Sequence, residues 1–424
     1  VLPQHHAEGL SDAVQCLQHR GEYLYAATGK GGFRVLDIAN IANKGVSDRI
    51  LTGPFSELGH DTQVESANAT CVSIVTTQPV APARNEGELM RVTNQERPFH
   101  PIYHYAFVTD AEEGLILVNI DTFTDGEPRN NFLERALTWN EGGILDGAQH
   151  ITMGGHLAYI LADAGLVILD LDDPLKPAVR SVLPLTDGRA SHLQFRYLFV
   201  TDAEGLKVVD VTDPDHPFVT VGNTIRLADA RGLFVARTWV YVAAGSEGLV
   251  VVDAEKPTAL KRYDVVGRDA GIVDARDVSV AHTNASLFAY VADGREGLKV
   301  VQLTAPDTVP GFYGFSPDPK PELVARYQTD APALAVTRPL ERDRAVDETG
   351  GQVAVFGRLG AGPLYQDDMR SLVFDKQGKP WTVTDTPGTG AMIPRGRPPA
   401  AMAEAETQEI RSASEGVGAG GGGR

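Results

Sequence analysis

The chain has 424 residues, of which 42% are hydrophobic, and its formal net charge at pH 7 is −18. An acidic chain without a basic stripe is not expected to bind nucleic acid, and no apolar run approaches the roughly 20 residues needed for a transmembrane helix. The 44 glycines and 26 prolines are typical of a turn-rich β protein.

A short apolar segment recurs along the chain after the first 11 residues, which are expected to form a polar N-terminal arm. Each copy begins with glycine, is rich in β-branched residues and follows a strand that ends in a turn. This order predicts a β-hairpin in which glycine adopts a positive φ. The near-continuous apolar character predicts strands buried on both faces. The six copies are "GFRVLDI" (32–38), "GLILVNI" (114–120), "GLVILDL" (165–171), "GLKVVDV" (205–211), "GLVVVDA" (248–254) and "GLKVVQL" (297–303).

A second landmark lies upstream of each hairpin: a small or polar residue, alanine, two variable residues and then an apolar strand. It occurs seven times, and the shorter spacings of about 40 to 45 residues fit a four-stranded propeller blade. We therefore expect an all-β, seven-bladed β-propeller over residues 12–385, with six or eight blades as alternatives. The blades are expected to start near residues 12, 68, 147, 189, 229, 274 and 330.

Four insertions interrupt the regular spacing, at residues 40–66, 77–102, 304–321 and 337–351. Loops of this kind leave the packing of the scaffold intact and are the usual place for contacts with partners. Residues 386–424 are rich in glycine, proline and alanine, which predicts a flexible C-terminal tail.

The two variable residues after each alanine are expected to circle the central channel, because every blade contributes its innermost strand to the ring. A polar binding site at the channel mouth would comprise Gln15, His150, His192, Arg231, Arg276 and Asp277. The alternative is that these polar side chains meet only water or bridge neighbouring blades.

A metal site is a further hypothesis, because Cys71, His150 and His192 fall in consecutive units and offer thiolate and imidazole ligands. A disulfide between Cys16 and Cys71 is the rival use of that cysteine, and it needs Cα atoms within roughly 7 Å. No catalytic motif is present, so no catalytic residue is assigned, and no cofactor is expected beyond this possible metal ion.

The segments "GLVILDL", "GLKVVDV" and "GLVVVDA", the first two with an Asp-Pro-x-x-Pro exit, resemble the LVIVD-repeat family of β-propellers. The resemblance spans about residues 10–385, and Asn119 and Gln302 depart from the repeat's aspartate. It implies a protein located outside the cytoplasm, in the periplasm or on the cell surface, without an assigned reaction. We therefore expect a non-catalytic protein-binding scaffold, a subunit of a larger surface or redox assembly, that contacts protein partners through its loops, insertions and terminal arms. The alternative is a metal- or small-anion-binding protein, or an enzyme, with its site at the channel mouth, formed by Cys71, His150, His192, Arg231, Arg276 and Asp277.

Overall fold

The computed structural model describes residues 13–20, 23–37, 62–75, 100–123, 131–220, 222–283, 286–305, 316–337, 358–359, 362–363 and 377–378. The chain divides into two units, Val1–Gly378 and Lys379–Arg424, and every described residue belongs to the first. The predicted N-terminal arm, the C-terminal tail and most of the four predicted insertions lie outside the described residues.

Six antiparallel sheets, here called blades 1 to 6, follow one another along the chain, and each starts from its innermost strand. Blade 1 contains β1 (Cys16–Arg20), β2 (Tyr23–Ala27), β3 (Phe33–Asp37) and β4 (Gln63–Val64). Blade 2 contains β5 (Ala69–Ile74), β6 (Tyr105–Asp110), β7 (Gly114–Asn119) and β8 (Glu134–Trp139). Blade 3 contains β9 (His150–Gly154), β10 (Leu157–Ala162), β11 (Gly165–Asp170) and β12 (Ala178–Leu183).

Blade 4 contains β13 (Ala190–Gln194), β14 (Tyr197–Asp202) and β15 (Gly205–Asp210), with its outer strand split into β16 (Phe218–Val219) and β17 (Ile225–Arg226). Blade 5 contains β18 (Leu233–Ala236), β19 (Trp239–Ala243), β20 (Leu249–Asp253) and β21 (Lys261–Val266). Blade 6 contains β22 (Asp277–Thr283), β23 (Ser286–Ala292), β24 (Leu298–Thr304) and β25 (Glu322–Tyr327). Four short 3-10 helices, η5 (Pro101–His104), η6 (Asp121–Phe123), η8 (Glu141–Gly143) and η9 (Arg268–Ala270), lie between strands, and β26 (Arg358–Leu359) pairs with β27 (Gly362–Pro363).

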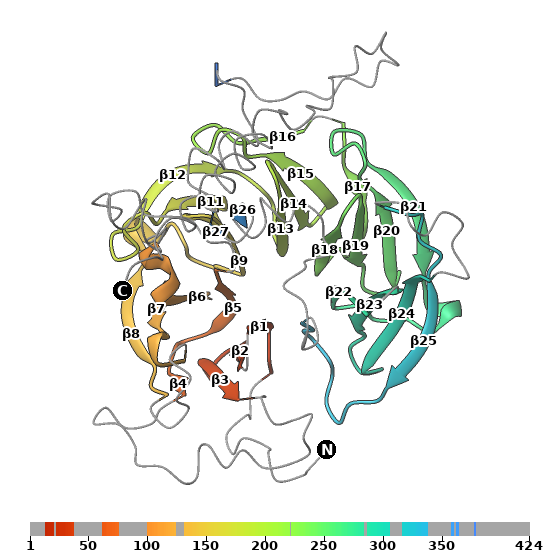
Figure 1. The fold of residues 1–424 in the computed structure, drawn as a ribbon, viewed down its shortest axis with the longest axis horizontal. Coiled ribbons are helices and arrows are strands. Elements are labelled where there is room, and N and C mark those ends of the chain that lie inside the picture. The colour runs from red at the N-terminus through yellow and green to blue at the C-terminus, as the bar shows by residue number, and fades with distance from the viewer. Residues whose placement is uncertain are drawn as a thin grey trace, which may run out of the picture. The chain divides into compact units, whose positions relative to one another are not determined.

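The innermost strands of successive blades lie side by side, in the order β1, β5, β9, β13, β18 and β22 (Figure 1). Within each blade the following strands run outward from them. The predicted all-β propeller of four-stranded antiparallel blades is therefore confirmed. None of the helices in the described part of the chain has the length and apolar character that a membrane crossing requires.

The described residues form six blades, so the predicted count of seven is not confirmed. A bridge between Gly294 and Ala333 repeats the inter-blade bridges at Gly29–Ala69 and Gly245–Ala275. It shows that Ala333, and not the expected Ala331, matches the alanines of the earlier units. Most of the expected seventh unit after residue 337 lies outside the described residues. Within the predicted insertion 40–66, residues 63 and 64 form β4, the outermost strand of blade 1.

The hairpin glycine is required by close backbone packing. Gly165 has a φ of 110°, and a Cβ there would lie 2.4 Å from the carbonyl oxygen of Leu183 at the end of the outermost strand. Gly205, with a φ of 133°, would meet the carbonyl oxygen of Ile225 at 2.1 Å. Any other residue would therefore clash with the outermost strand as well as strain the backbone. This double requirement explains why the repeat begins with glycine.

The hydrophobic core lies between the blades. Along β10, Ala158, Ile160 and Ala162 face a cluster shared with blade 2, whereas Tyr159 and Leu161 face one shared with blade 4. Alternate residues of a strand point to opposite faces of its sheet, so the middle strands must be apolar throughout. The same arrangement joins the other neighbouring blades, and it confirms the predicted burial on both faces.

A disulfide joins the innermost strands of blades 1 and 2. Cys16 on β1 is bonded to Cys71 on β5, with a Cα–Cα distance of 4.8 Å. Two residues farther along β1, the side chain of Gln18 donates to the carbonyl of Ile74 (2.9 Å) and accepts from its N–H (2.6 Å). Covalent and polar links therefore fasten the first blade to the second.

Removing this disulfide is expected to destabilise the protein. The bond closes a sequence separation of 55 residues, and restricting the unfolded chain over that length contributes about 4 kcal/mol in the chain-entropy model. A Cys16→Ser/Cys71→Ser double variant should therefore unfold at a lower denaturant concentration than the parent. Chemical denaturation with and without a dithiol reductant provides the measurement. The reductant should lower the midpoint of the parent alone, and an equal effect on the double variant would contradict the assignment.

Candidate binding site in the central channel

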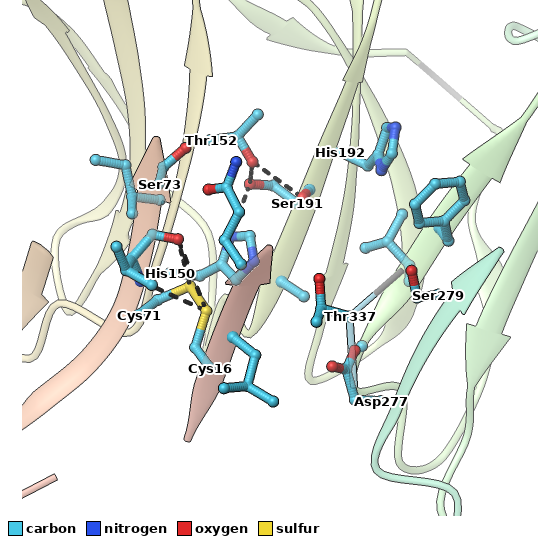
Figure 2. Close-up of a pocket in the computed structure, with 18 of the residues that line it drawn as sticks. Cys16, Cys71, Ser73, His150, Thr152, Ser191, His192, Asp277, Ser279 and Thr337 are labelled. Carbon is cyan, nitrogen blue, oxygen red and sulfur yellow. Dashed lines mark hydrogen bonds between the residues drawn. A yellow bond between two sulfur atoms is a disulfide. The ribbon is translucent and has the colours of Figure 1, made fainter. Parts of the chain in front are cut away.

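A cavity of about 850 Å³ occupies the centre of the ring. All six innermost strands line it, together with Leu334, Val336 and Thr337 from the segment after blade 6. Figure 2 shows the Cys16–Cys71 disulfide and His150 on one side, and Asp277, Ser279 and Thr337 on the other. The cavity is accordingly built from side chains of every described blade.

Strand register defines which channel residues are equivalent. In each blade, the residue directly after the hairpin glycine pairs with a residue of the second strand. That second-strand residue also pairs with one residue of the innermost strand, and this innermost residue is the equivalent position. For example, His150 pairs with Leu161, which pairs with Leu166. We call these equivalent positions the channel ring: Cys16, Cys71, His150, Ala190, Gly232 and Asp277.

The channel ring corrects two positions of the alignment made from sequence, in blades 4 and 1. Ala190 rather than His192 is equivalent to His150, since Ala190 lies opposite Thr201. His192 lies two residues farther along β13. In blade 1 the equivalent residue is Cys16, directly after Gln15. The correction also accounts for the disulfide, which joins equivalent positions on adjacent strands.

His150 is an uncharged imidazole in the channel wall. Its Nδ1 lies 3.2 Å from Ser191 Oγ, which is itself 2.9 Å from Thr152 Oγ1. Burial, followed by the charge of His192 on the neighbouring strand, lowers the pKa of His150 to about 4. The imidazole of His150 therefore stays neutral at pH 7. The stability contributed by the neutral ring is present above the pKa of this histidine in the unfolded chain, and it is lost as the pH falls below that pKa toward 4.

Asp277 carries a carboxylate on the opposite wall. One oxygen accepts the N–H of Val278 (2.8 Å) and the other accepts the N–H of Val336 (2.9 Å). Burial raises the pKa of Asp277 to about 6, against the smaller lowering effect of these two hydrogen bonds. A Cβ on the neighbouring Gly232 would lie 2.2 Å from an oxygen of this carboxylate, so glycine is needed there.

The arginines of the predicted site are held by aspartates. Arg231 pairs with Asp229 at 2.9 Å, and Arg276 pairs with Asp274 at 2.7 Å. Arg189, which sequence reasoning did not single out, bridges blade 4 to Asp229 and the carbonyl of Ala230 in blade 5. These pairs match the structural alternative of polar groups that bridge blades or pair locally. Their charges are already compensated, which weakens the argument for an anion site.

The structure brings Cys71, His150 and His192 to the same channel, but the sulfur of Cys71 is bonded to Cys16 and offers no thiolate. Within the described ranges, no group of three His, Cys, Asp or Glu side chains could hold one metal ion. Metal binding by these residues therefore stays a prediction.

Ser191 follows a landmark alanine and was expected in the channel, but the hydroxyl groups of Thr152, Ser73 and Ser279 were not predicted. Thr152 and Ser191 link β9 to β13, and Ser73 and Ser279 also line the cavity. Serine and threonine are common throughout the chain, so only their register on innermost strands could have marked them.

Solved structures with a similar overall arrangement share little sequence with this chain. A protein from Lactobacillus plantarum is 12% identical, with a TM-score of 0.47, and the match covers 76% of this chain and 86% of that chain. The β-propeller domain of Cps50 (Swd1) from Myceliophteria thermophila is 11% identical, with a TM-score of 0.44 and coverages of 76% and 88%. The WD40 repeats of RRP9 are 10% identical, with a TM-score of 0.43 and coverages of 77% and 84%. At this level the similarity does not extend to function.

No curated protein matches the chain significantly. The LVIVD repeat, in contrast, matches residues 14–52, 147–181, 195–222, 228–261 and 274–307. These segments fall in blades 1, 3, 4, 5 and 6, and blade 2, which carries Asn119 and the long insertion, is not matched. LVIVD repeats in five segments on a ring of antiparallel blades are consistent with the LVIVD-repeat β-propeller family, and they confirm the resemblance seen in the sequence.

Proposed function

We propose that this propeller is a non-catalytic, protein-binding scaffold that works outside the cytoplasm as a subunit of a larger surface or redox assembly. The observation that carries the proposal is the apolar character of its outer strands. Six of the eight exposed large apolar side chains in the described residues lie on outermost strands: Val179, Val182, Phe218, Tyr263, Val324 and Tyr327.

These side chains lie on a rigid support. Phe218 and Tyr327 are 55% and 59% exposed. Arg180 on β12 makes two hydrogen bonds of 2.7 Å to Asp215, in the loop just before Phe218. Outermost strands also carry unpaired backbone groups along one edge, which can pair with a strand of another chain. Exposed aromatic side chains on a fixed edge are suited to bury against a partner protein.

Substitution of the exposed aromatic residues is expected to weaken a native complex while leaving the fold intact. A Phe218→Ser/Tyr327→Ser variant should bind its partner about tenfold more weakly, because each aromatic anchor contributes apolar burial. Co-elution of the native complex in size-exclusion chromatography, with thermal unfolding measured in parallel, provides the readout. Lys261→Ser, at an exposed polar position of β21, is the matched control. A native protein that elutes alone would contradict a scaffold role.

The proposed location outside the cytoplasm draws support from the Cys16–Cys71 disulfide, since such bonds persist mainly in oxidising compartments. Protein isolated from its own cells under alkylating conditions is expected to keep both cysteines blocked from alkylation until a reductant is added. Recovery of two free thiols, together with a cytoplasmic fraction, would rule out this location.

A seventh blade is also proposed, formed by residues 330–385. Its support is the segment 333–337, which contacts blade 6 through the Gly294–Ala333 bridge and blade 1 through a hydrogen bond from His19 N to Thr337 Oγ1 (3.2 Å). A chain that ends at residue 337 should therefore unfold at a lower temperature than one that ends at residue 385. Equal midpoints would mean that the ring is complete with six blades.

A further inference from the structure

Among the described residues, Asp277 differs from three other carboxylates near the channel in having no counter-charge. Asp187 and Asp229 pair with Arg189, and Asp274 pairs with Arg276. Asp277 accepts only two backbone N–H groups, and none of the described lysines, arginines or histidines forms an ion pair with it. Burying a carboxylate without a neighbouring cation costs free energy, so an unpaired carboxylate at this position needs a physical reason.

The arginine next to it in sequence does not neutralise this charge. Arg276 and Asp277 are consecutive at the start of β22, where side chains alternate between the two faces of the sheet. Arg276 donates to Asp274, and its Nε is buried without an acceptor among the described residues. Asp277 therefore lines the cavity as a carboxylate without a cationic partner among the described residues, whereas the Nε of Arg276 is closed off from solvent.

The remaining groups around Asp277 are neutral or already paired. Thr337 and Ser279 lie near it in the cavity (Figure 2), and Gly232, just before β18, packs its backbone against one oxygen of the carboxylate without adding a side chain. Across the cavity, His150 is neutral at pH 7 and His192 contacts the ring of Phe234. Arg231 is bound to Asp229. Of these groups, Asp277 is therefore the one with which a positively charged group in the cavity would form an ion pair.

We propose that the channel receives a lysine or arginine side chain from an extended segment of a partner protein, and that Asp277 is its counter-charge. This inference rests on the proposed protein-binding function and names the chemistry of the partner. The cationic group would pair with the carboxylate, which otherwise accepts two backbone N–H groups. The cavity of about 850 Å³ is larger than one amine needs, and its hydroxyl groups suit a peptide backbone.

Peptide binding to the intact chain tests the proposal. The probes are acetyl-Gly-Gly-Lys-Gly-Gly-amide and its norleucine counterpart, which has a similar shape and no charge. Calorimetric titration should show binding of the lysine peptide that is at least about tenfold tighter, because an interaction with a charged group is lost in the neutral peptide. n-Butylamine serves as the free-amine arm. If it binds as tightly as the lysine peptide, the site takes a small amine and the peptide assignment is overturned.

Two variants separate the role of the carboxylate from an effect of net charge. Asp277→Asn keeps an acceptor for Val336 N–H and should lose the preference for lysine. Asp264→Asn removes an exposed carboxylate that likewise accepts the N–H of the next residue, and it should bind as the parent does. Equal binding by the parent and Asp277→Asn would overturn the proposal.

The parent chain alone provides a second measurement, which does not depend on the folding of a variant. Because burial raises the pKa of Asp277 to about 6, lowering the pH from 7.5 to 5 should weaken lysine-peptide binding roughly tenfold as the carboxylate takes up a proton. Any pH dependence that other groups contribute would persist in Asp277→Asn. A pH-independent affinity would contradict the role of Asp277. Loss of the native complex in the Phe218→Ser/Tyr327→Ser variant, but not in Asp277→Asn, would retain the scaffold and reject the channel.

Discussion

The structure depends on one packing constraint: each sheet has two apolar faces and must be covered by a neighbour on both sides. In β14, Leu198 and Val200 pack toward blade 3, whereas Phe199 between them packs toward blade 5. A single blade would expose half of these side chains to water, so the repeat is stable only as part of a series. The ring geometry, the channel and the ordered outer strands all follow from this requirement.

The ring geometry also leaves backbone polar groups without strand partners at its centre. Innermost strands of neighbouring blades converge there, and their inner backbone edges have no strand to pair with. Side chains satisfy some of these backbone groups, since Gln18 bonds the backbone of Ile74, Thr152 bonds the carbonyl of Ser191, and Gln194 bonds the carbonyl of Arg237. Polar residues in the channel are therefore partly structural. A functional interpretation is strongest where a polar atom makes no such bond.

Much of the fold could be predicted, because the hairpin glycine and the continuous apolar character of strands buried on both faces recur along the chain. The register of the channel was harder to predict. In blades 2, 3, 5 and 6 the ring residue lies two positions after the alanine, but in blades 1 and 4 the residues two positions before it are Val14 and Gly188, so an alignment on alanine displaced Gln15 and His192 from the ring position. The disulfide could be named only as one alternative, since contact between Cys16 and Cys71 depends on how two blades pack. Whether a carboxylate has an arginine partner, as Asp274 does and Asp277 does not, depends on side-chain geometry that spacing does not encode.

The disulfide also bears on how the ring can come apart. A linear series of repeats opens most readily at its ends, where a terminal unit is covered on one side only. Blade 1 is the first blade along the chain, and its innermost strand is covalently bound to that of blade 2. Separation of blade 1 from blade 2 would therefore require the disulfide to break, whereas the core shared by blades 2 and 3 is not crossed by that bond. Blades 1 and 2 are thus expected to stay together when the series opens, and the disulfide directs the first separation to another pair of neighbouring blades.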